Sequence, residues 1–457
     1  MSSGKIAAVI LAAGKGVRMN SAIPKVMHPL AGRPMIAHVV AALAPLAPDP
    51  LVVVVGPDMD EIATAVPSAH IAVQRDQRGT GDAVKAALPA LDRVEGDVLI
   101  VFGDSPLIGT ETMRQMLEVR HRAPEPTVVV LGFRPDDTQQ YGRLIVAPDG
   151  GLDAIVEHRD ADAEQRKVTL CNSGVMAVDG ARLPALLDAL RDDNEKGEFY
   201  LTDIVGAARA DGAPCAYVEA PAEDLMGINS RAELADAEAA MQRRLRTAML
   251  AAGVALVDPQ TVYLSHDTEI GRDTVVEPHV IFGPGVRVGE RAVIKGFSHI
   301  EGTTIADGAR VGPYARLRPG TEIGADAHVG NFVEVKNAVL AAGAKANHLS
   351  YIGDASVGER SNIGAGTITC NYDGFLKSRT EIGEGVFIGS NTALVAPVSI
   401  GDGAIVGAGS TVDRDVEANA MAVARPKIVL RSGSAESFRN RKRAMKEGRQ
   451  KKPDGKA

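Results

Sequence analysis

An apolar residue recurs every six positions between Ile270 and Val412. The positions form three runs: Ile270, Val276, Phe282, Val288, Ile294 and Ile300; Ile305, Val311, Leu317, Ile323, Val329 and Val335; and Ile382, Ile388, Leu394, Ile400, Val406 and Val412. Glycine directly follows ten of these eighteen residues. Neither an α-helix nor an ordinary strand has a period of six, whereas each face of a β-solenoid takes about six residues. The stretch therefore predicts a solenoid with the repeated residue pointing inward.

Three such faces make a coil of about 18 residues. The span of the repeat (412 − 270 = 142 residues) then gives about eight coils, which form a prism of roughly 38 Å at the ~4.8 Å spacing of strands. An irregular Gly-rich β domain is the alternative, but too many positions follow the repeat for it to be favoured. The pattern resembles the left-handed parallel β-helix of hexapeptide acyltransferases. The left hand is taken from that resemblance, because parallel crossovers are normally right-handed.

Length and charge limit the remaining possibilities. With 457 residues the chain is too long for one core, which predicts two or three domains. The net charge of −8 implies no general attraction to nucleic acid. Three cysteines without a C-x-x-C pair are typical of a reducing cytosol. The sequence has no signal-peptide pattern and no apolar run of the ~18 residues that a membrane span needs. We therefore expect a cytoplasmic protein with no membrane or nucleic-acid partner.

Residues 1–229 have the pattern of an α/β domain. Short apolar runs predict buried parallel strands at 6–11, 51–55, 98–102 and 127–131, with helical patterns such as 34–46 and 81–91 between them. The alternation predicts a doubly wound, Rossmann-like, mainly parallel sheet. In such a sheet, ligands bind at the carboxyl ends of the strands.

A glycine-containing loop follows the first predicted strand. Its sequence is LAAGKGVRM (residues 11–19), and Pro24-Lys25 comes soon after. Exposed backbone N–H groups, together with Arg18 and Lys25, could hold a triphosphate. The motif lacks the third glycine of a dinucleotide fingerprint and is not a Walker A loop. A tight strand–helix turn with solvated cations is the alternative interpretation of this loop.

A carboxylate follows a second buried strand, in the sequence VLIVFGD (residues 98–104). Asp104 has no obvious packing role there, and Mg²⁺ prefers oxygen ligands and bridges substrate phosphates. The alternative role of Asp104 is to cap the helix that follows Pro106.

Together these motifs resemble the nucleotidyltransferases that activate sugar 1-phosphates, which carry an L-x-x-G-x-G-x-R-M loop, a P-K and a strand-end G-D. Further segments fall in the order expected for that family: QRDQRGTG (74–81), Tyr141-Gly142, Val156-Glu157, Asn172-Ser173-Gly174 and Gly227-Ile228-Asn229. With the repeat behind them, residues 5–427 resemble the bacterial family of bifunctional N-acetylglucosamine-1-phosphate uridyltransferases and glucosamine-1-phosphate acetyltransferases. Phe102 stands where Tyr is common in the family, and Val17 where Thr is expected.

The resemblance implies a site for UTP and UDP-N-acetylglucosamine in the first domain. The residues implied are Leu11, Ala12, Ala13, Gly14, Lys25, Gln74, Gly79, Thr80, Phe102, Gly103, Asp104, Gly142, Glu157, Asn172, Tyr200, Thr202 and Asn229. Lys25 would lie on the phosphates and Arg18 on the leaving pyrophosphate, while Asp104 and Asn229 would bind Mg²⁺. Such a transfer needs in-line positioning and charge stabilisation more than a protein nucleophile.

Residues 230–252 have the pattern of a linking helix. Ser230 and Glu233 form a capping-box pattern. Leu234, Met241 and Met249 belong to an apolar stripe at helical spacing, which is most often simple packing. We expect a uridyltransferase domain at 1–229, this linker, an acetyltransferase β-helix at 253–427, and a basic, disordered tail with a helical tendency at 428–457.

The six-residue rhythm weakens between Lys336 and Asp373, where the sequence turns polar. It contains NHLSYIGD (347–354) and SNIGAGTITCNYDG (361–374). Polar residues give a solenoid no packing advantage, so we expect a site here. The resemblance implies that His348 is the general base for direct attack of the sugar amine on acetyl-CoA, a role that suits imidazole.

The resemblance also implies two sets of binding residues around His348. Glucosamine 1-phosphate would contact Arg318, Lys336, Tyr351, Asn362 and Lys377. Acetyl-CoA would contact Ala365, Asn371, Tyr372, Ser390, Ala408 and Arg425. Members of the family are homotrimers, with this site assembled between neighbouring prisms.

The main hypothesis is a two-site enzyme that makes UDP-N-acetylglucosamine, a precursor of bacterial wall and surface polysaccharides. One alternative is a monofunctional sugar-1-phosphate nucleotidyltransferase whose β-helix is only an oligomerisation scaffold. A second is a metal-bound solenoid hydrolyase like the γ carbonic anhydrases. His279, His299, His328 and His348 lie in the region, but none forms the H-x-x-x-x-H pair that such a site needs.

Overall fold

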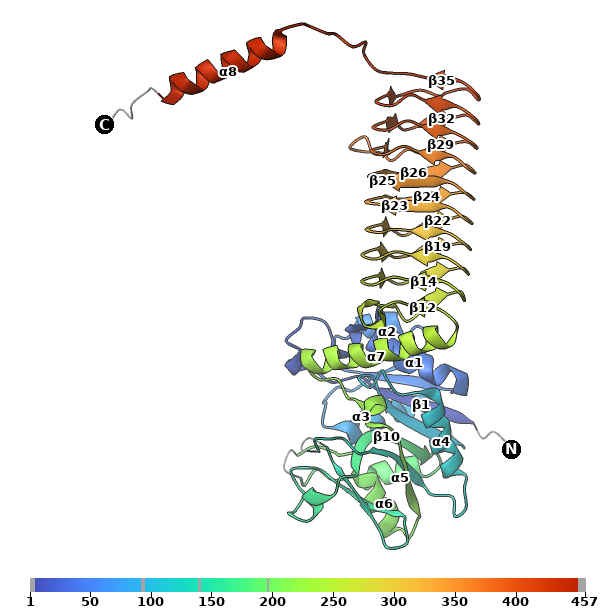
Figure 1. The fold of residues 1–457 in the computed structure, drawn as a ribbon. Coiled ribbons are helices and arrows are strands. Elements are labelled where there is room, and N and C mark those ends of the chain that lie inside the picture. Colours follow the sequence, from blue (N-terminus) through green and yellow to red (C-terminus); the bar gives the residue numbers. More distant parts are fainter. Residues whose placement is uncertain (1–4, 92–94, 139–140, 195–196, 451–457) are drawn as a thin grey trace. The chain divides into compact units, whose positions relative to one another are not determined.

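The computed structural model describes residues 5–91, 95–138, 141–194 and 197–450 (Figure 1). The chain divides into two compact units. The first contains residues 1–291 and 299–302, and the second contains 292–298 and 303–457. The first unit carries the α/β sheet and the beginning of the β-helix, and the second carries most of the coils.

The α/β part is built on a nine-stranded sheet in the order β11-β7-β10-β6-β1-β4-β5, with β8 paired to β10 and β9 paired to β8. Its strands are β1 (Ile6–Leu11), β4 (Leu51–Val55), β5 (His70–Val73), β6 (Asp97–Phe102), β7 (Val128–Phe133), β8 (Arg143–Val146), β9 (Leu152–Val156), β10 (Cys171–Asp179) and β11 (Cys215–Glu219). The expected apolar strands are present, and β1 lies parallel to both β4 and β6. Strand β10 runs antiparallel to β6 and β7, which makes the sheet mixed but mainly parallel.

Helices cover both faces of this sheet. They are α1 (Met35–Leu43), α2 (Asp60–Ala65), α3 (Thr80–Leu91), α4 (Thr110–Arg120), α5 (Leu183–Asp188) and α6 (Asp203–Ala210). Alternate residues of β1 point to opposite faces. Val9 packs in the core with α3, α5 and α6, whereas Ile10 packs with α1, α2 and α4. The sheet is therefore doubly wound, and its strand ends remain open to a ligand.

Helix α7 (Arg231–Ala251) follows this domain. The Ser230 side chain accepts a hydrogen bond from the Glu233 backbone N–H at the start of the helix. Ala237 and Ala240 are buried against Leu30 and Ile228 of the α/β part. Helix α7 thus packs on the domain that precedes it.

The β-helix begins with short parallel pairs in the first unit: β12 (Ala255–Leu256) with β14 (Val275–Val276), β13 (Glu269–Ile270) with β16 (Arg287–Val288), and β15 (Ile281–Phe282) with β18 (His299–Ile300). Two long parallel stacks fill the second unit (Figure 1). One contains β17 (Val293–Ile294), β20 (Arg310–Val311), β23 (His328–Asn331), β25 (Lys345–His348), β27 (Asn362–Ile363), β30 (Phe387–Ile388), β33 (Ile405–Val406) and β35 (Met421–Ala422). The main path of the other contains β19 (Thr303–Ile305), β22 (Thr321–Ile323), β24 (Glu334–Leu340), β26 (Tyr351–Val357), β28 (Ile368–Cys370), β31 (Ala393–Val395) and β34 (Thr411–Val412). In the same sheet, β21 (Arg316–Leu317) pairs with β24, β29 (Thr380–Ile382) pairs with β26, and β32 (Val398–Ile400) pairs with β29.

The repeated apolar residues form the interior of the prism. Val311, Leu317, Val329 and Ile388, for example, are fully buried. Glycine after the repeated residue has a steric reason besides turn formation. A Cβ on Gly324 would lie only 2.7 Å from the backbone of the next coil. The glycines therefore allow successive coils to approach each other at strand spacing.

The polar insert changes the step between coils. Glu334 pairs with Tyr351, 17 residues on, whereas Ala355 pairs with Thr380, 25 residues on. The longer step accommodates a hairpin, in which Ser378 N–H donates to Asn371 O at 2.9 Å. Tyr372 and Lys377 pair there in an isolated antiparallel β-bridge. The weakened rhythm thus corresponds to a shortened coil followed by a loop.

The described part of the tail contains a helix, α8 (Ser434–Gln450). Its sequence is rich in Ala, Arg, Lys, Met and Glu, which are strong helix formers. Residues 451–457 of the expected tail lie outside the described residues.

Candidate functional site

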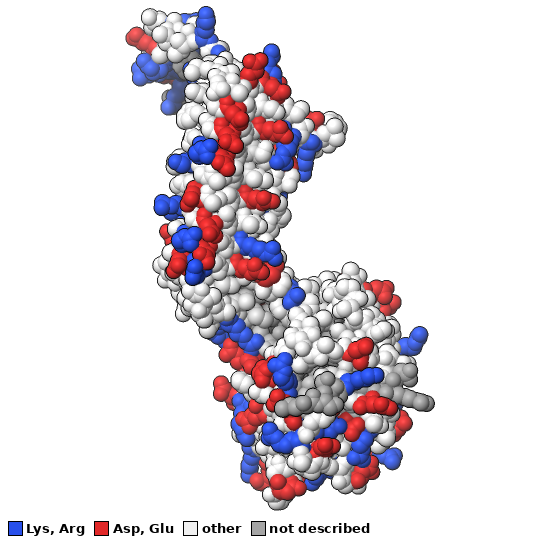
Figure 2. Space-filling model, turned by 90° about the vertical axis from the view of Figure 1, so that its right-hand side faces the viewer, with Lys and Arg blue, Asp and Glu red and all other residues white. Residues whose placement is uncertain are grey.

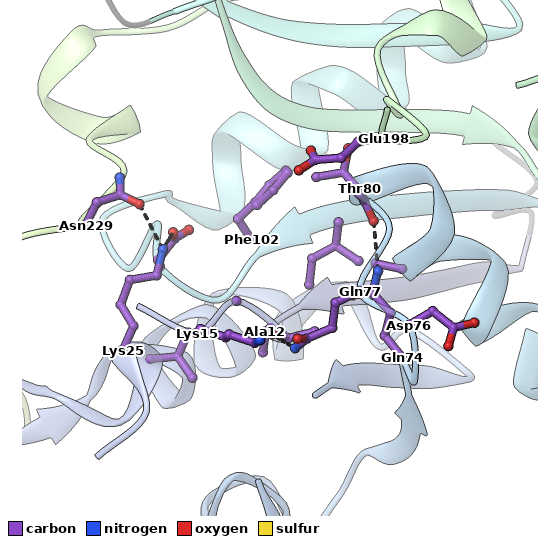
Figure 3. A pocket seen from close by; sticks show the side chains of 17 residues that line it. Ala12, Lys15, Lys25, Gln74, Asp76, Gln77, Thr80, Phe102, Glu198 and Asn229 are labelled. Atoms are coloured by element: carbon purple, nitrogen blue, oxygen red, sulfur yellow. Dashed lines mark hydrogen bonds and ion pairs between the residues drawn. The ribbon is translucent and has the colours of Figure 1, made fainter. Parts of the chain in front are cut away.

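A cavity of about 620 Å³ opens at the carboxyl ends of β1 and β6 (Figure 3). Eleven of the nucleotide-site residues expected from the sequence line it: Leu11, Ala12, Ala13, Gly14, Lys25, Gln74, Gly79, Thr80, Phe102, Asp104 and Asn229. Figure 3 shows Lys25 and Asn229 at one end, Gln74 and Thr80 at the other, and Phe102 between them. The cavity thus has a charged end and an amide-rich end.

At the charged end, two oxygen ligands converge on one cation. Nζ of Lys25 donates to Oδ1 of Asn229 at 2.9 Å and forms an ion pair with Oδ2 of Asp104. The side chains of Lys25 and Asp104 are 13% and 15% exposed, so water screens this pair only partly. A carboxylate and an amide oxygen aimed at one point can share a positive charge.

Local structure fixes each member of this group. Asp104 follows β6, and its carbonyl accepts from Ile228 N–H at 3.0 Å, which joins the strand end to the segment before α7. The Glu233 carboxylate accepts from Asn229 N–H at 2.7 Å. Gly16 has φ +59°, and a Cβ there would lie 2.7 Å from Cβ of Lys25. The first glycine loop therefore packs directly against the lysine.

The amide-rich end is built from the QRDQRGTG segment. Nε2 of Gln74 donates to Gly79 O at 2.9 Å and to Asp82 Oδ2 at 2.8 Å. Gly79 has φ +105°, and a Cβ there would lie 2.6 Å from the Phe199 carbonyl. Only glycine fits that position without strain. Thr80 accepts a hydrogen bond from Leu201 N–H at 3.0 Å and begins α3.

A second group of expected residues lies outside the cavity lining. Asn172 N–H donates to Gly142 O at 2.8 Å, and Thr202 Oγ1 donates to Glu157 Oε1 at 3.4 Å. The Phe102 ring, which lines the cavity, lies next to this group. A Cβ on Gly174, two residues after Asn172, would lie 2.6 Å from that ring. The structure thus brings Gly142, Glu157, Asn172 and Thr202 together, behind the aromatic ring rather than in the cavity.

Three other expected residues do not line the cavity. Gly103 is buried, with its N–H donating to Leu11 O at 3.0 Å. Arg18 is exposed on the short helix Val17–Met19, and Tyr200 is half-buried ahead of α6. The cavity is also lined by residues that were not expected from the sequence, namely Lys15, Val26, Asp76, Gln77, Ala83 and Glu198. Gln77 lies within the QRDQRGTG segment, and its side chain donates to Ala13 O at 2.7 Å, so the motif itself contained the signal.

The β-helix holds a second candidate site, around His348. His348 is exposed at the end of β25, and its Nδ1 lies 2.6 Å from Oδ1 of Asn331 on the neighbouring strand β23. An amide oxygen can only accept, so Nδ1 carries the proton and the lone pair of Nε2 is available. The imidazole can therefore take a proton at Nε2.

Cations gather on the adjoining face of the coil. The pKa of Lys336 lies below its ordinary value, first because of the hydrogen bond and the charge of Lys377 beside it, and further because of Arg318. Arg318 forms an ion pair with Glu334 at 3.0 Å. Two ammonium groups held against each other favour binding of an anion, which would relieve their repulsion.

The remaining residues expected around the sugar occupy neighbouring coils. Tyr351 pairs in register with Glu334, and Asn362 pairs with Lys345. Asp354, on the same strand as Tyr351, accepts hydrogen bonds from Asn337 at 2.6 Å and from Asn371 at the base of the hairpin. Burial alone would raise the pKa of Asp354, but hydrogen bonds from Asn337 and Asn371 lower it. The carboxylate stays ionised and anchors the hairpin that carries Lys377.

The residues expected for acetyl-CoA follow a line along successive coils. Asn391 N–H donates to Ala365 O at 2.7 Å, and Gly409 N–H donates to Ser390 O at 2.8 Å. The Arg425 guanidinium donates to Ala408 O. Asn371 is buried at the base of the hairpin, and Tyr372 is exposed on it with its hydroxyl donating to Gly374 O at 2.6 Å.

Known protein families match both parts of the chain. Residues 8–244 match the MobA-like NTP transferase domain. Residues 302–337 and 379–414 match the bacterial transferase hexapeptide repeat, and the fold of the coils is the left-handed parallel β-helix of that family. In the part of the chain that the structure describes, no helix is both long and apolar enough to cross a membrane.

Curated relatives align with the chain over nearly its whole length. The chain is 56% identical to the bifunctional protein GlmU of Paramagnetospirillum magneticum, over 98% of this chain and 99% of the relative. It is 59% identical to that of Rhodospirillum rubrum, over 96% and 99%. It is 54% identical to that of Sphingopyxis alaskensis, over 98% and 99%.

Proposed function

Since the chain belongs to the GlmU family of bifunctional proteins, we propose that its two sites catalyse two successive transferase reactions. The β-helix site acetylates glucosamine 1-phosphate with acetyl-CoA. The α/β site then transfers UMP from UTP to N-acetylglucosamine 1-phosphate and releases pyrophosphate. The product is UDP-N-acetylglucosamine. The functional domains are 1–229 and 253–427, joined by the helix of 230–252, with a basic tail at 428–457.

In the first reaction, the sugar amine attacks the thioester carbonyl of acetyl-CoA. A C–N bond forms, the C–S bond breaks, and CoA leaves as the thiol. Nε2 of His348 takes the proton that the attacking amine loses, because Asn331 holds the proton on Nδ1. Lys336, Lys377 and Arg318 bind the phosphate of the sugar, with Tyr351 and Asn362 completing the pocket. Acetyl-CoA extends along Ala365, Asn371, Tyr372, Ser390, Ala408 and Arg425.

In the second reaction, a phosphate oxygen of the sugar attacks the α-phosphorus of UTP, and the bond to the pyrophosphate breaks. Lys25 and Arg18 stabilise the charge on the transferred and leaving phosphates. Gln74, Gly79 and Thr80 contact the uridine nucleotide. The sugar lies at Gly142, Glu157, Asn172, Tyr200 and Thr202. The Phe102 ring, between the cavity and this group, then marks the border between nucleotide and sugar.

We propose that Asp104 and Asn229 hold Mg²⁺. Their oxygens already converge on one cation, Nζ of Lys25, so the donor set fits a hard metal ion. Among the described residues no cluster of three or more His, Cys, Asp or Glu could hold a metal. Bound there, the ion would supply positive charge that neutralises the charge developing on the substrate phosphates.

We propose a homotrimer built through the β-helix. An apolar column supports this: Phe297, Tyr314 and Phe332 stack with ring centroids 5.0 and 5.1 Å apart and are about half exposed. Leu349 continues it at 62% exposure. A repeated exposed aromatic row favours burial against another copy of the chain. Light scattering, which measures the mass of the oligomer, tests the trimer.

A cytoplasmic location stays a prediction from the sequence.

The pair His348–Asn331 is the observation that favours two activities over a passive β-helix. A scaffold has no use for an exposed imidazole whose Nδ1 is held by the amide oxygen of Asn331. The test supplies glucosamine 1-phosphate, acetyl-CoA and UTP together and identifies the products. UDP-N-acetylglucosamine should form, and omission of acetyl-CoA should abolish it. A chain that needs N-acetylglucosamine 1-phosphate from outside would be the monofunctional alternative.

A further inference from the structure

A row of cationic side chains runs along one face of the β-helix outside the residues discussed above. Arg310 on β20 pairs in register with His328 on β23, and His328 pairs with Lys345 on β25. Lys345 pairs in turn with Asn362 on β27. Side chains at paired positions of a parallel stack point the same way. Arg310, His328 and Lys345, here called the cationic column, therefore lie one above another, each roughly 4.8 Å from the next.

The cations of this column lack acidic partners. Elsewhere on the β-helix, Arg287 pairs with Glu269 at 3.2 Å and Arg360 pairs with Glu359 at 2.7 Å. Figure 2 shows acidic and basic side chains side by side along the face of the β-helix that it presents. Arg310 and Lys345 take part in no ion pair with any described residue. No described residue therefore neutralises their positive charge.

The pKa of His328 is consistent with a positive electrostatic field along the column. This pKa lies below the ordinary value, first because of partial burial and then because of Lys295, Arg310, Lys345 and His348. The four neighbouring groups that lower it are all basic. A positive region on a chain with a net charge of −8 is a specific feature rather than a consequence of overall charge.

The column leads to the acetyl-transfer site. Lys345 and His348 are the first and last residues of β25, roughly 10 Å apart at the rise of a strand. Strand β23 likewise joins His328 to Asn331, the partner of His348. Asn362, at the end of the row, is a residue proposed for the sugar pocket. Of the two charged members, Lys345 thus lies on the same strand as the catalytic imidazole, and Arg310 lies two strands away, on β20.

We propose that the cationic column binds phosphate groups of the substrates of the acetyl-transfer site and guides them towards His348. The proposal rests on the acetyltransferase function above and extends it to residues outside the pocket. Two sources of phosphate are available, the sugar 1-phosphate and the phosphates of CoA. A field of this kind raises the rate of productive encounter, and salt weakens it.

Removal of charge from the column tests the proposal. The variants are Arg310→Gln, Lys345→Gln and both together, with Lys345→Arg to restore charge. Arg287→Gln is the matched control, because it also removes one cation from the β-helix but from a neutralised pair. The readout is kcat/KM for each substrate of acetyl transfer, at about 20 mM and about 0.5 M ionic strength.

At low salt we expect roughly 3-fold lower kcat/KM for each single variant and roughly 10-fold for the double variant, with kcat unchanged. At high salt the differences should disappear, since the Debye length falls to a few ångströms. Lys345→Arg and Arg287→Gln should stay within about 1.5-fold of the wild type. A loss only towards glucosamine 1-phosphate assigns the sugar phosphate. A loss only towards acetyl-CoA that disappears with dephospho-acetyl-CoA assigns the 3′-phosphate of the cofactor.

Two results would overturn the proposal. One is a double variant within about 1.5-fold of the wild type for both substrates at low salt. The other is an equal loss at both salt concentrations together with a changed oligomeric state, which would make the column a structural interface. Calorimetric binding of CoA gives a readout that needs no turnover. If the wild type transfers no acetyl group, the proposed function fails, whereas weaker CoA binding by the double variant at low salt alone still supports the column.

Discussion

Nδ1 of His348 and Oδ1 of Asn331 lie 2.6 Å apart on adjacent coils of the β-helix. The two residues are paired in register, 17 positions apart in the chain. Asn331 thereby orients the imidazole and keeps the basic nitrogen, Nε2, free. The coil-to-coil stacking of the β-helix thus supplies a positioning residue that no local motif contains.

The first prediction concerns this pair. Asn331→Ala should lower kcat for acetyl transfer by about 10-fold to 100-fold, part of the ~10²–10⁴ that a general base contributes. KM should change little, because Asn331 touches the base rather than the substrate. Uridylyl transfer by the same protein is the internal control. ¹⁵N NMR of labelled histidine should show loss of the single Nδ1–H tautomer, and a variant with kcat within twofold of the wild type would make the pair incidental.

The second prediction concerns Lys25 and a divalent ion. The ammonium and the ion use the same oxygens of Asp104 and Asn229. Lys25→Met should therefore tighten Mn²⁺ binding to the nucleotide-free protein by roughly tenfold, since a positive charge is removed from the site. Uridylyl transfer should nevertheless fall, because a phosphate-binding cation is lost.

Electron paramagnetic resonance of Mn²⁺ measures that affinity directly. Asp104→Asn provides the opposite case and should weaken Mn²⁺ binding in the same titration. Equal Mn²⁺ affinity in the wild type and Lys25→Met would show that the ammonium and the metal do not compete for these oxygens.

The third prediction concerns the reactivity of Lys336. Lys377 and Arg318 lower the pKa of Lys336, so a larger fraction of its amine is neutral at pH 8 than for an ordinary lysine. Lys336 should react faster with acetic anhydride than Lys15, as peptide mass spectrometry would reveal. Lys377→Met should slow the labelling of Lys336 by raising its pKa, and glucosamine 1-phosphate should protect it. If neither Lys377→Met nor glucosamine 1-phosphate changed the rate at which Lys336 is labelled, the cation cluster would be refuted.

The fourth prediction concerns the close contact of strands β23 and β25. A Cβ at Gly330 would overlap the carbonyl oxygen of Asn347, next to His348. Gly330→Ala should destabilise the β-helix by about 1–3 kcal/mol or more and displace His348. Gly206→Ala is the matched control, because nothing lies within 4 Å of its Cβ in α6 and alanine favours a helix by about 0.5–1 kcal/mol.

Thermal melting followed by circular dichroism compares these two glycine variants. Gly330→Ala should melt at a lower temperature than the wild type and lose acetyl transfer, whereas Gly206→Ala should melt at the same or a slightly higher temperature. A Gly330→Ala variant as stable and as active as the wild type would mean that the two strands separate easily at this point.

The sequence was sufficient for the architecture, because both folds repeat a simple pattern. Residues such as Val311 and Val329 mark the prism interior, and the strands of Ile10 and Val101 follow from continuous apolar runs. The motif residues Gly14, Lys25 and Asp104 come together because strand ends share one edge of the sheet. Such features depend on local chemistry and are visible in a single sequence.

Side-chain contacts that depend on how distant segments are aligned in the fold were not predictable from the sequence. Asn331 meets His348 only because one coil is 17 residues long rather than 18. Gln77 reaches Ala13 across the sheet edge, and Glu233 fixes Asn229 from the first turn of α7. The antiparallel course of β10 is also a property of the whole sheet. Each of these depends on contacts between segments whose spacing the sequence does not state.

The most direct test of two independent active sites is release of the CoA thiol from acetyl-CoA with glucosamine 1-phosphate present and UTP absent. The wild type, His348→Ala and Asp104→Ala are compared as folded oligomers. We predict thiol release at the wild-type rate in Asp104→Ala and a loss of about 10²-fold or more in His348→Ala. Release that falls equally in both variants, or that persists in His348→Ala, would contradict the account.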